Sequence, residues 1–96
     1  MEKLFDLGRI VATPDALEAL DENGQVAFDF LERHAVGDWG TVWGEDKDAN
    51  EEALVSGARI MSVYKLKDGE EIWIITEAAD ENGAREATTL LLPQNY

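Results

Sequence analysis

The chain of 96 residues carries 21 acidic and 8 basic side chains, a net charge of −13, and no cysteine. This length is typical of one domain, so residues 1–96 are expected to fold as a single acidic domain. The absence of cysteine excludes disulfides, thiolate nucleophiles and cysteine-based zinc sites, and the negative charge opposes direct binding to nucleic acid phosphates or anionic membranes.

A strand and a helix are predicted first along the chain. Residues 4–13 favour a short strand with a bulge at Gly8. Thr13 is a suitable N-cap, and Pro14 suits the first position of a helix. The helix that starts there is expected to end at Asn23-Gly24, because glycine readily adopts the left-handed conformation that terminates helices.

Further helical signals follow. A second helix is predicted to start near Gln25, where apolar residues recur at helical spacing. A glycine-rich loop over residues 37–44 contains Trp39 and Trp43. A third helix is expected over residues 46–56, so the chain should hold two to three short helices.

From residue 59 onward the hydrophobic period changes to two, which predicts three strands. They cover residues 59–66, 71–78 and 86–92, and Asp68-Gly69 and Asn82-Gly83 between them are strong signals of two-residue hairpin turns. The predicted fold is therefore α+β, with an N-terminal strand, two to three short helices and a C-terminal three-stranded antiparallel β-meander.

Two-residue turns also predict the register of this meander. They place Tyr64 opposite Trp73, and Trp73 opposite Leu92, on one face of the sheet. Both faces are apolar near the middle of the sheet. We therefore expect helices or loops to cover both of them, at least partly.

Candidate catalytic groups are few. The one histidine, His34, could form a Ser–His–acid arrangement only with Ser56 or Ser62. Neither serine is expected in the strand-to-helix turn that exposes a nucleophile. A histidine near the end of a helix more simply compensates the helix dipole. We therefore expect no enzymatic activity and no cofactor.

One acidic segment starts like a calcium-binding loop. Residues 46–52 offer side-chain oxygens at the first, third and fifth positions of such a loop. The sixth position is Glu51 instead of glycine and the twelfth is Gly57 instead of glutamate. The segment is better explained as a solvated helix start, and no metal site is expected.

Negative charge is concentrated in the helical part, since residues 15–56 carry a net charge of −10. Helix positions three and four apart place carboxylates about 5–6 Å from one another, comparable to phosphates along a nucleic acid backbone. Repulsion within such rows predicts a domain that is more stable near pH 5 than near pH 7. The residues predicted to bind a partner are Asp15, Glu18, Glu22, Asp29, Glu32, Glu45, Asp48 and Glu52, with Trp39 as an anchor.

The two tryptophans of the glycine-rich loop allow a second interpretation. Tryptophan is enriched at the centres of protein interfaces, but in a domain with one small core Trp39 and Trp43 are more simply explained as core or loop-packing residues. The sequence leaves this alternative open.

Four blocks of the sequence carry a further signal: residues 4–14 (LFDLGRIVATP), 33–40 (RHAVGDWG), 72–78 (IWIITEA) and 88–93 (TTLLLP). Together they resemble a family of short bacterial proteins from plasmids and other mobile elements, labelled plasmid-related proteins. The resemblance covers nearly the whole chain and implies a role in the conflict between mobile elements and host defences. It carries over no established activity or functional residues.

Two functional hypotheses follow. The first is a non-enzymatic, cytoplasmic protein of a mobile element that mimics nucleic acid and inhibits a restriction or CRISPR protein. Its partner would be the basic surface of that protein, without direct contact to nucleic acid or membrane. The alternative is a small structural or regulatory module that self-associates, as a homodimer for example. It is suggested by Leu90, Leu91 and Leu92, which are expected on an uncovered edge strand.

Overall fold

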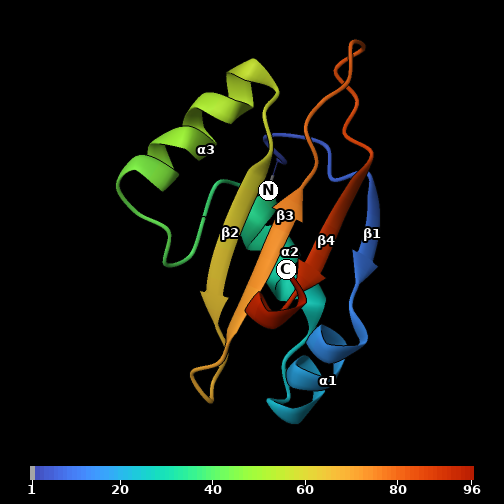
Figure 1. The fold of residues 1–96 in the computed structure, drawn as a ribbon, viewed down its shortest axis with the longest axis vertical. Coiled ribbons are helices and arrows are strands. Elements are labelled where there is room, and N and C mark those ends of the chain that lie inside the picture. The colour runs from blue at the N-terminus through green and yellow to red at the C-terminus, as the bar shows by residue number, and fades with distance from the viewer. Residues whose placement is uncertain (1) are drawn as a thin grey trace.

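The computed structural model describes residues 2–96 and contains three α-helices, a four-stranded sheet and a C-terminal 3₁₀ turn (Figure 1). In chain order the elements are β1 (Arg9–Ala12), α1 (Pro14–Glu22), α2 (Ala27–Ala35), α3 (Glu45–Ser56), β2 (Ile60–Lys65), β3 (Glu71–Thr76), β4 (Ala87–Leu91) and the 3₁₀ turn (Pro93–Asn95). The predicted α+β class is confirmed.

Local capping determines two of the helix ends. The Oγ1 of Thr13 accepts a hydrogen bond from the backbone N–H of Ala16 at 3.1 Å, and Pro14 occupies the first turn of α1. Helix α3 ends at Gly57, whose φ of +83° lies in the left-handed region. Both ends agree with the prediction from the sequence.

The sheet has the strand order β1-β4-β3-β2, with β1 parallel to β4 and the other neighbours antiparallel. The three C-terminal strands pair in the predicted antiparallel order, but the sheet is four-stranded and mixed, because β1 adds in parallel to β4 and makes β4 an interior strand instead of an edge. Gly8 permits the parallel pairing, because its φ is +66° and a Cβ there would lie 2.3 Å from the carbonyl oxygen of Arg85.

Both hairpin loops contain three residues where two were predicted. In the first loop, residues 67–69, the N–H of Leu66 donates to the carbonyl of Glu70 at 2.8 Å, and Gly69 has a φ of +90°. The second loop, residues 81–83, has the same form and also ends in a glycine with positive φ. A glycine at the third position of a three-residue loop is a common hairpin solution.

The extra loop residue shifts the register by one position. Tyr64 lies opposite Ile72, and Trp73 lies opposite Leu91. Since neighbouring residues of a strand point to opposite faces, this shift puts Trp73 on the face away from Tyr64 and Leu92. The predicted stacking of Trp73 between these two residues is wrong.

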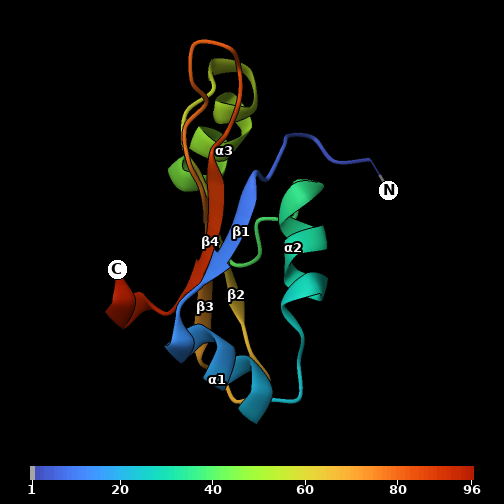
Figure 2. The ribbon, with the colours of Figure 1, turned by 90° about the vertical axis from the view of Figure 1, so that its right-hand side faces the viewer.

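One face of the sheet is covered by α1 and α2, as Figure 2 shows. The main core lies between these helices and the sheet, and a smaller cluster joins α3 to β2. The main core comprises Ala16, Ala19, Leu20, Phe30, Tyr64, Leu66, Ile72, Ile74, Leu90 and Leu92, and the smaller cluster Trp39, Ala53 and Ile60.

On the opposite face the C-terminal turn lies against one end of the sheet, whereas α3 lies beside the edge strand β2 (Figures 1 and 2). Trp73 lies half-buried on this face and packs edge-on against Tyr96, with ring centroids 5.4 Å apart. The expectation that both faces are covered at least partly is therefore met, since Ile75 and Leu91 on this second face are also buried.

In the edge strand β2, the outward backbone groups of Met61 and Val63 are hydrogen-bonded to neighbouring elements. The side chain of Asn50 accepts from the N–H of Met61 at 3.1 Å and donates to its carbonyl at 2.7 Å. Two residues further, the N–H of Val63 donates to the carbonyl of Trp39, and its carbonyl accepts from Thr41 N–H at 2.7 Å. Helix α3 and the glycine-rich loop thus occupy the edge groups through which another strand could pair.

Candidate partner-binding site

All eight carboxylates predicted to contact a partner are exposed. They form three separate rows, one on each helix, and the rows of α1 and α3 lie at opposite ends of the molecule (Figure 1). The row of α1 (Asp15, Glu18 and Glu22) borders a hollow of about 220 Å³ together with Glu70. The structure therefore supplies several acidic surfaces instead of one continuous strip.

Few of the carboxylates are neutralised by ion pairs. Within residues 2–96 the only salt bridge joins Arg33 and Asp38. None of the eight predicted carboxylates has a basic side chain within ion-pair distance. Their charge is therefore available to a cationic partner.

The structure separates the two tryptophans of the glycine-rich loop. Trp39 is only 4% exposed, packs in the cluster with Ala53 and Ile60, and donates from Nε1 to a carboxylate oxygen of Glu51 at 2.7 Å. Trp43 is 81% exposed. Trp39 is thus placed in the core, away from the surface where an anchor was expected, and Trp43 is the tryptophan that a partner can reach.

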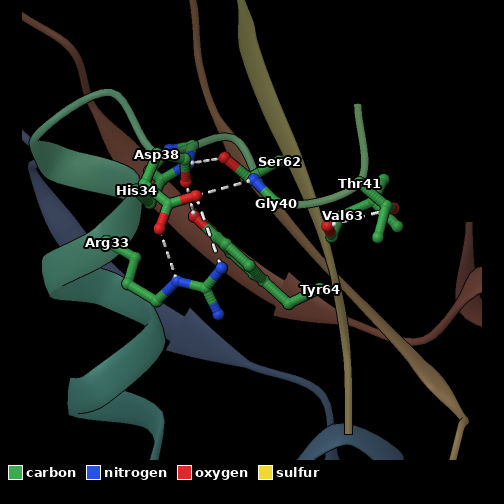
Figure 3. Close-up of polar contacts among 8 residues, drawn as sticks. All are labelled: Arg33, His34, Asp38, Gly40, Thr41, Ser62, Val63 and Tyr64. Carbon is green, nitrogen blue, oxygen red and sulfur yellow. Dashed lines mark hydrogen bonds and ion pairs between the residues drawn. The ribbon is translucent and has the colours of Figure 1, made fainter. Parts of the chain in front are cut away.

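Asp38 organises the loop that carries both tryptophans (Figure 3). Its carboxylate accepts from Nε of Arg33 at 2.7 Å, from Nη2 of the same residue at 3.3 Å, and from the backbone N–H of Gly40 at 3.1 Å. These bonds, and above all the one from Arg33, hold the pKa of Asp38 below its usual range. The arrangement fixes the direction in which the loop leaves α2.

Tyr64 links this loop to the sheet. Its hydroxyl donates to the backbone carbonyl of Asp38 at 2.6 Å, and the guanidinium of Arg33 lies 4.5 Å from the centre of its ring. Burial raises the pKa of Tyr64, so the hydroxyl remains a donor. Arg33, Asp38 and Gly40 belong to the sequence block 33–40 that carries the resemblance. Their hydrogen bonds show a structural role that the sequence pattern did not predict.

His34 lies at the centre of a buried chain of polar groups. Its Nδ1 is 2.6 Å from Oγ of Ser62, and its Nε2 is 2.8 Å from Oγ1 of Thr76. Thr76 is 2.7 Å from Thr88, whose hydroxyl donates to the carbonyl of Leu7 at 2.6 Å. Because a carbonyl only accepts and each hydroxyl has one hydrogen, Thr76 donates to Thr88, and His34 donates from Nε2 to Thr76. Burial lowers the pKa of His34 to about 4, so the imidazole is neutral at pH 7 and Nδ1 accepts from Ser62.

The distance between Nδ1 of His34 and Oγ of Ser62 is like that between the base and the nucleophile of a hydrolase, but the surroundings of the pair differ. Both side chains are fully buried, and neither borders the groove described below. The third member of the chain is Thr76 instead of a carboxylate. Burial, with a contribution from the nearby charge of Arg85, lowers the pKa of His34 to about 4. The arrangement is suited to holding α2 on the sheet rather than to attacking a substrate.

Arg85 is a second buried polar group. Its guanidinium donates from Nη1 to the carbonyls of Ala58 and Glu77, at 2.8 and 3.0 Å, and from Nη2 to the carbonyl of Ala53 at 3.0 Å. It thereby ties the C-terminal end of α3 to the end of β3. Burial lowers the pKa of this guanidinium.

A groove of about 720 Å³ runs between α2 and the N-terminal segment with β1. Phe28 of α2 lies 65% exposed at this groove. Charged side chains at the groove are Lys3, Asp29, Glu32 and the paired Arg33 and Asp38. Its apolar lining consists of Leu7, Ile10, Phe28, Leu31, Ala35 and Val36.

Among residues 2–96, no group of three or more histidine, aspartate or glutamate side chains is arranged to hold a metal ion. None of the helices in this part of the chain is both long enough and apolar enough to cross a bilayer. Comparison of the chain with protein-family models, with curated proteins and with solved structures finds no match.

Proposed function

We propose that this chain is a non-enzymatic acidic binding protein that occupies a basic surface of a protein partner, in place of nucleic acid. The observation that supports the proposal is the absence of basic partners around the helical carboxylates in residues 2–96. A net charge of about 2–8 suffices for solubility in a small domain. The charge of −13 exceeds that need.

Helix α3 presents the best-placed acidic surface. Only Asn50 and Ala53 of this helix are buried, and they attach it to β2. Glu45, Asp48 and Glu52 are exposed at spacings of three and four residues, which puts them on one side of the helix.

Apolar groups flank this carboxylate row. Trp43 precedes the helix and is 81% exposed, and Val55 in its last turn is 92% exposed. A row of carboxylates beside an exposed tryptophan combines long-range attraction with a contact that excludes water. The α3 surface, defined as Trp43, Glu45, Asp48, Glu52 and Val55, is therefore our first choice for the partner contact.

The resemblance to plasmid-related proteins suggests which partners to test. Purified restriction and CRISPR effector complexes expose basic surfaces that normally bind nucleic acid phosphates. We expect binding to one such complex, competition by its nucleic acid, and a lower affinity at higher salt.

A matched pair of variants tests the role of the carboxylates. The triple variant Glu45→Gln, Asp48→Asn, Glu52→Gln should weaken binding. The control Glu77→Gln, Glu81→Gln, Glu86→Gln changes the net charge equally at exposed positions outside the three rows and should bind like the parent. Equal losses in both variants, or binding that salt does not affect, would contradict the proposal.

Self-association is the second candidate function, and one observation favours it. Trp73 is half-buried on the sheet face that has no helix over its middle, so a second copy could pack against this tryptophan. The original reason, an exposed edge strand at Leu90–Leu92, no longer applies because β4 is interior. Sedimentation analysis at high micromolar concentration separates the alternatives, since a strict monomer excludes this one.

A further inference from the structure

The backbone of β1 remains open along one side. The N–H of Arg9 donates to the carbonyl of Glu86 at 2.9 Å, so Arg9 faces β4. Because backbone groups alternate in direction along a strand, the N–H and C=O groups of Ile10 and Ala12 point away from β4. No hydrogen bond within residues 2–96 uses these four groups. They are a template on which an extended segment could pair.

The groove lies where the side chains of such a segment would point. Ile10 is paired with the buried Thr88, so its side chain is on the sheet face that α2 covers, and it borders the groove. A strand added to β1 would run about 4.8 Å from it. Every second side chain of that strand would enter the groove and contact Leu31 and Phe28 of α2.

The charges around the groove indicate the chemistry of the segment. Arg33 and Asp38 neutralise each other through their ion pair. Of the remaining charged groups, the carboxylates of Asp29 and Glu32 outnumber the ammonium group of Lys3. The apolar stem of an arginine or lysine could lie along the apolar lining while its charged end reaches these carboxylates.

We propose that the groove between β1 and α2 binds an extended segment of a protein partner, which pairs with the backbone of Ile10 and Ala12 and directs apolar and basic side chains into the groove. The proposal deepens the proposed function, on which it rests for the cationic character of the partner. A second copy of this chain is a less suitable occupant, because each copy carries a net charge of −13 and brings the same carboxylates.

A library of random dodecapeptides displayed on phage tests this inference, with the intact protein as the target. We expect selected peptides that alternate apolar residues with arginine or lysine. A synthetic peptide with a selected sequence should shift the amide resonances of Ile10 and Ala12 in nuclear magnetic resonance spectra of the protein. N-methylation of the peptide amides that pair with β1 should weaken binding about tenfold or more, because each methyl group removes a donor.

Matched variants locate the contact. Phe28→Ser and Glu32→Lys should each weaken the selected peptide about tenfold, since they remove an apolar and an acidic contact. Leu17→Ser and Glu77→Lys make comparable changes at exposed positions outside both the groove and the α3 surface, and should leave peptide binding unchanged. All four positions are exposed, so the variants should fold.

Several results would overturn the inference: no enrichment, selected peptides without basic residues, equal binding by the Phe28→Ser variant, or unchanged affinity after N-methylation. Failure of the proposed function looks different. Peptides selected as expected, together with no binding to any restriction or CRISPR complex, would support the groove and remove the defence partner. Salt-dependent binding to a complex that is lost in the α3 triple variant but retained in Phe28→Ser would support the proposed function and contradict the groove as a binding site.

Discussion

The Nε2 of His34 donates to the Oγ1 of Thr76 at 2.8 Å, in an interior where both side chains are fully buried. No carboxylate takes part in this contact, and the nearby charged group, Arg85, is itself positive. A protonated imidazole would therefore be poorly accommodated. The folded protein holds His34 neutral well below the pH at which an exposed histidine gains its proton.

This histidine predicts how stability changes with pH. The folded pKa of His34 is about 4 and the unfolded value is about 6.5, so the unfolded chain binds the proton first as the pH falls. The stabilisation is fully present above about pH 6.5 and is lost as the pH falls towards 4. We expect the free energy of unfolding to fall by roughly 2 kcal/mol between pH 7 and pH 5 in urea melts.

The direction is opposite to that predicted from repulsion between helical carboxylates. His34→Gln serves as a control, because it has no group that titrates in this range and its amide can still donate to Thr76. Its stability should change less between pH 7 and pH 5 than that of the parent. A parent that is more stable at pH 5, or equal slopes in both proteins, would show that His34 does not control the profile.

Replacement of Arg85 should destabilise the fold although a positive charge is kept. The guanidinium reaches the three carbonyls from two nitrogens, whereas Arg85→Lys puts all donors on a single nitrogen without this planar fork, so we expect at least one buried acceptor to lose its partner. We expect a loss of about 2 kcal/mol in the free energy of unfolding. The control is Arg59→Lys at an exposed position, where a change within about 0.5 kcal/mol is expected. Similar losses in both variants would contradict this account.

Substitutions at Gly40 and Gly69 distinguish the cost of a steric clash from the cost of backbone strain. Both have positive φ, but a Cβ at Gly40 would lie 1.9 Å from the carbonyl oxygen of Val63, whereas a Cβ at Gly69 meets nothing within 4 Å. Gly69→Ala should cost about 1–2 kcal/mol from strain alone, and Gly40→Ala about 2–4 kcal/mol because the loop must also leave β2. Thermal denaturation of both variants checks the order. Equal losses would mean that the loop does not need its close approach to β2.

Trp73 lies on the sheet face opposite α1 and α2 and tests whether a second copy packs there. Because the side chain is half-buried and packs on Tyr96, Trp73→Ala should cost about 1–3 kcal/mol in the monomer. A well-packed core tryptophan would cost about 3–5 kcal/mol. Urea denaturation at two protein concentrations provides the measurement. A loss in the higher range that grows with protein concentration would show that a second copy covers this face.

Local signals predicted the helices better than the sheet. The Thr13-Pro14 start of α1 and the Gly57 end of α3 depend on side chains and dihedral angles within a few residues, which the sequence displays directly. The parallel pairing of β1 with β4 joins residues separated by most of the chain, and no periodicity encodes it. The register failed for a local reason, because the Asp68-Gly69 signal does not distinguish two-residue from three-residue loops.

The candidate site was also predicted only in part. Exposure of the helical carboxylates followed from their type and spacing, and it was foreseen. The burial of Trp39 depends on Glu51 and Ile60, which come from two other elements. The groove and the open edge exist only once β1 has joined the sheet. Such features require tertiary contacts that sequence patterns do not contain.

The hydrogen bonds that occupy the outer edge of β2 limit the growth of any intermolecular sheet. The segment Glu71–Thr76 (EIWIIT) has the composition of strands that form fibrils, but in the fold it has a strand on either side. If two folded copies paired through β1, each outer edge of the joined sheet would be a β2 strand blocked by Asn50 and the glycine-rich loop. Addition would stop at two chains. Fibril growth from this protein therefore requires both α3 and the glycine-rich loop to leave β2 first, so its rate should follow the local unfolding of these two elements.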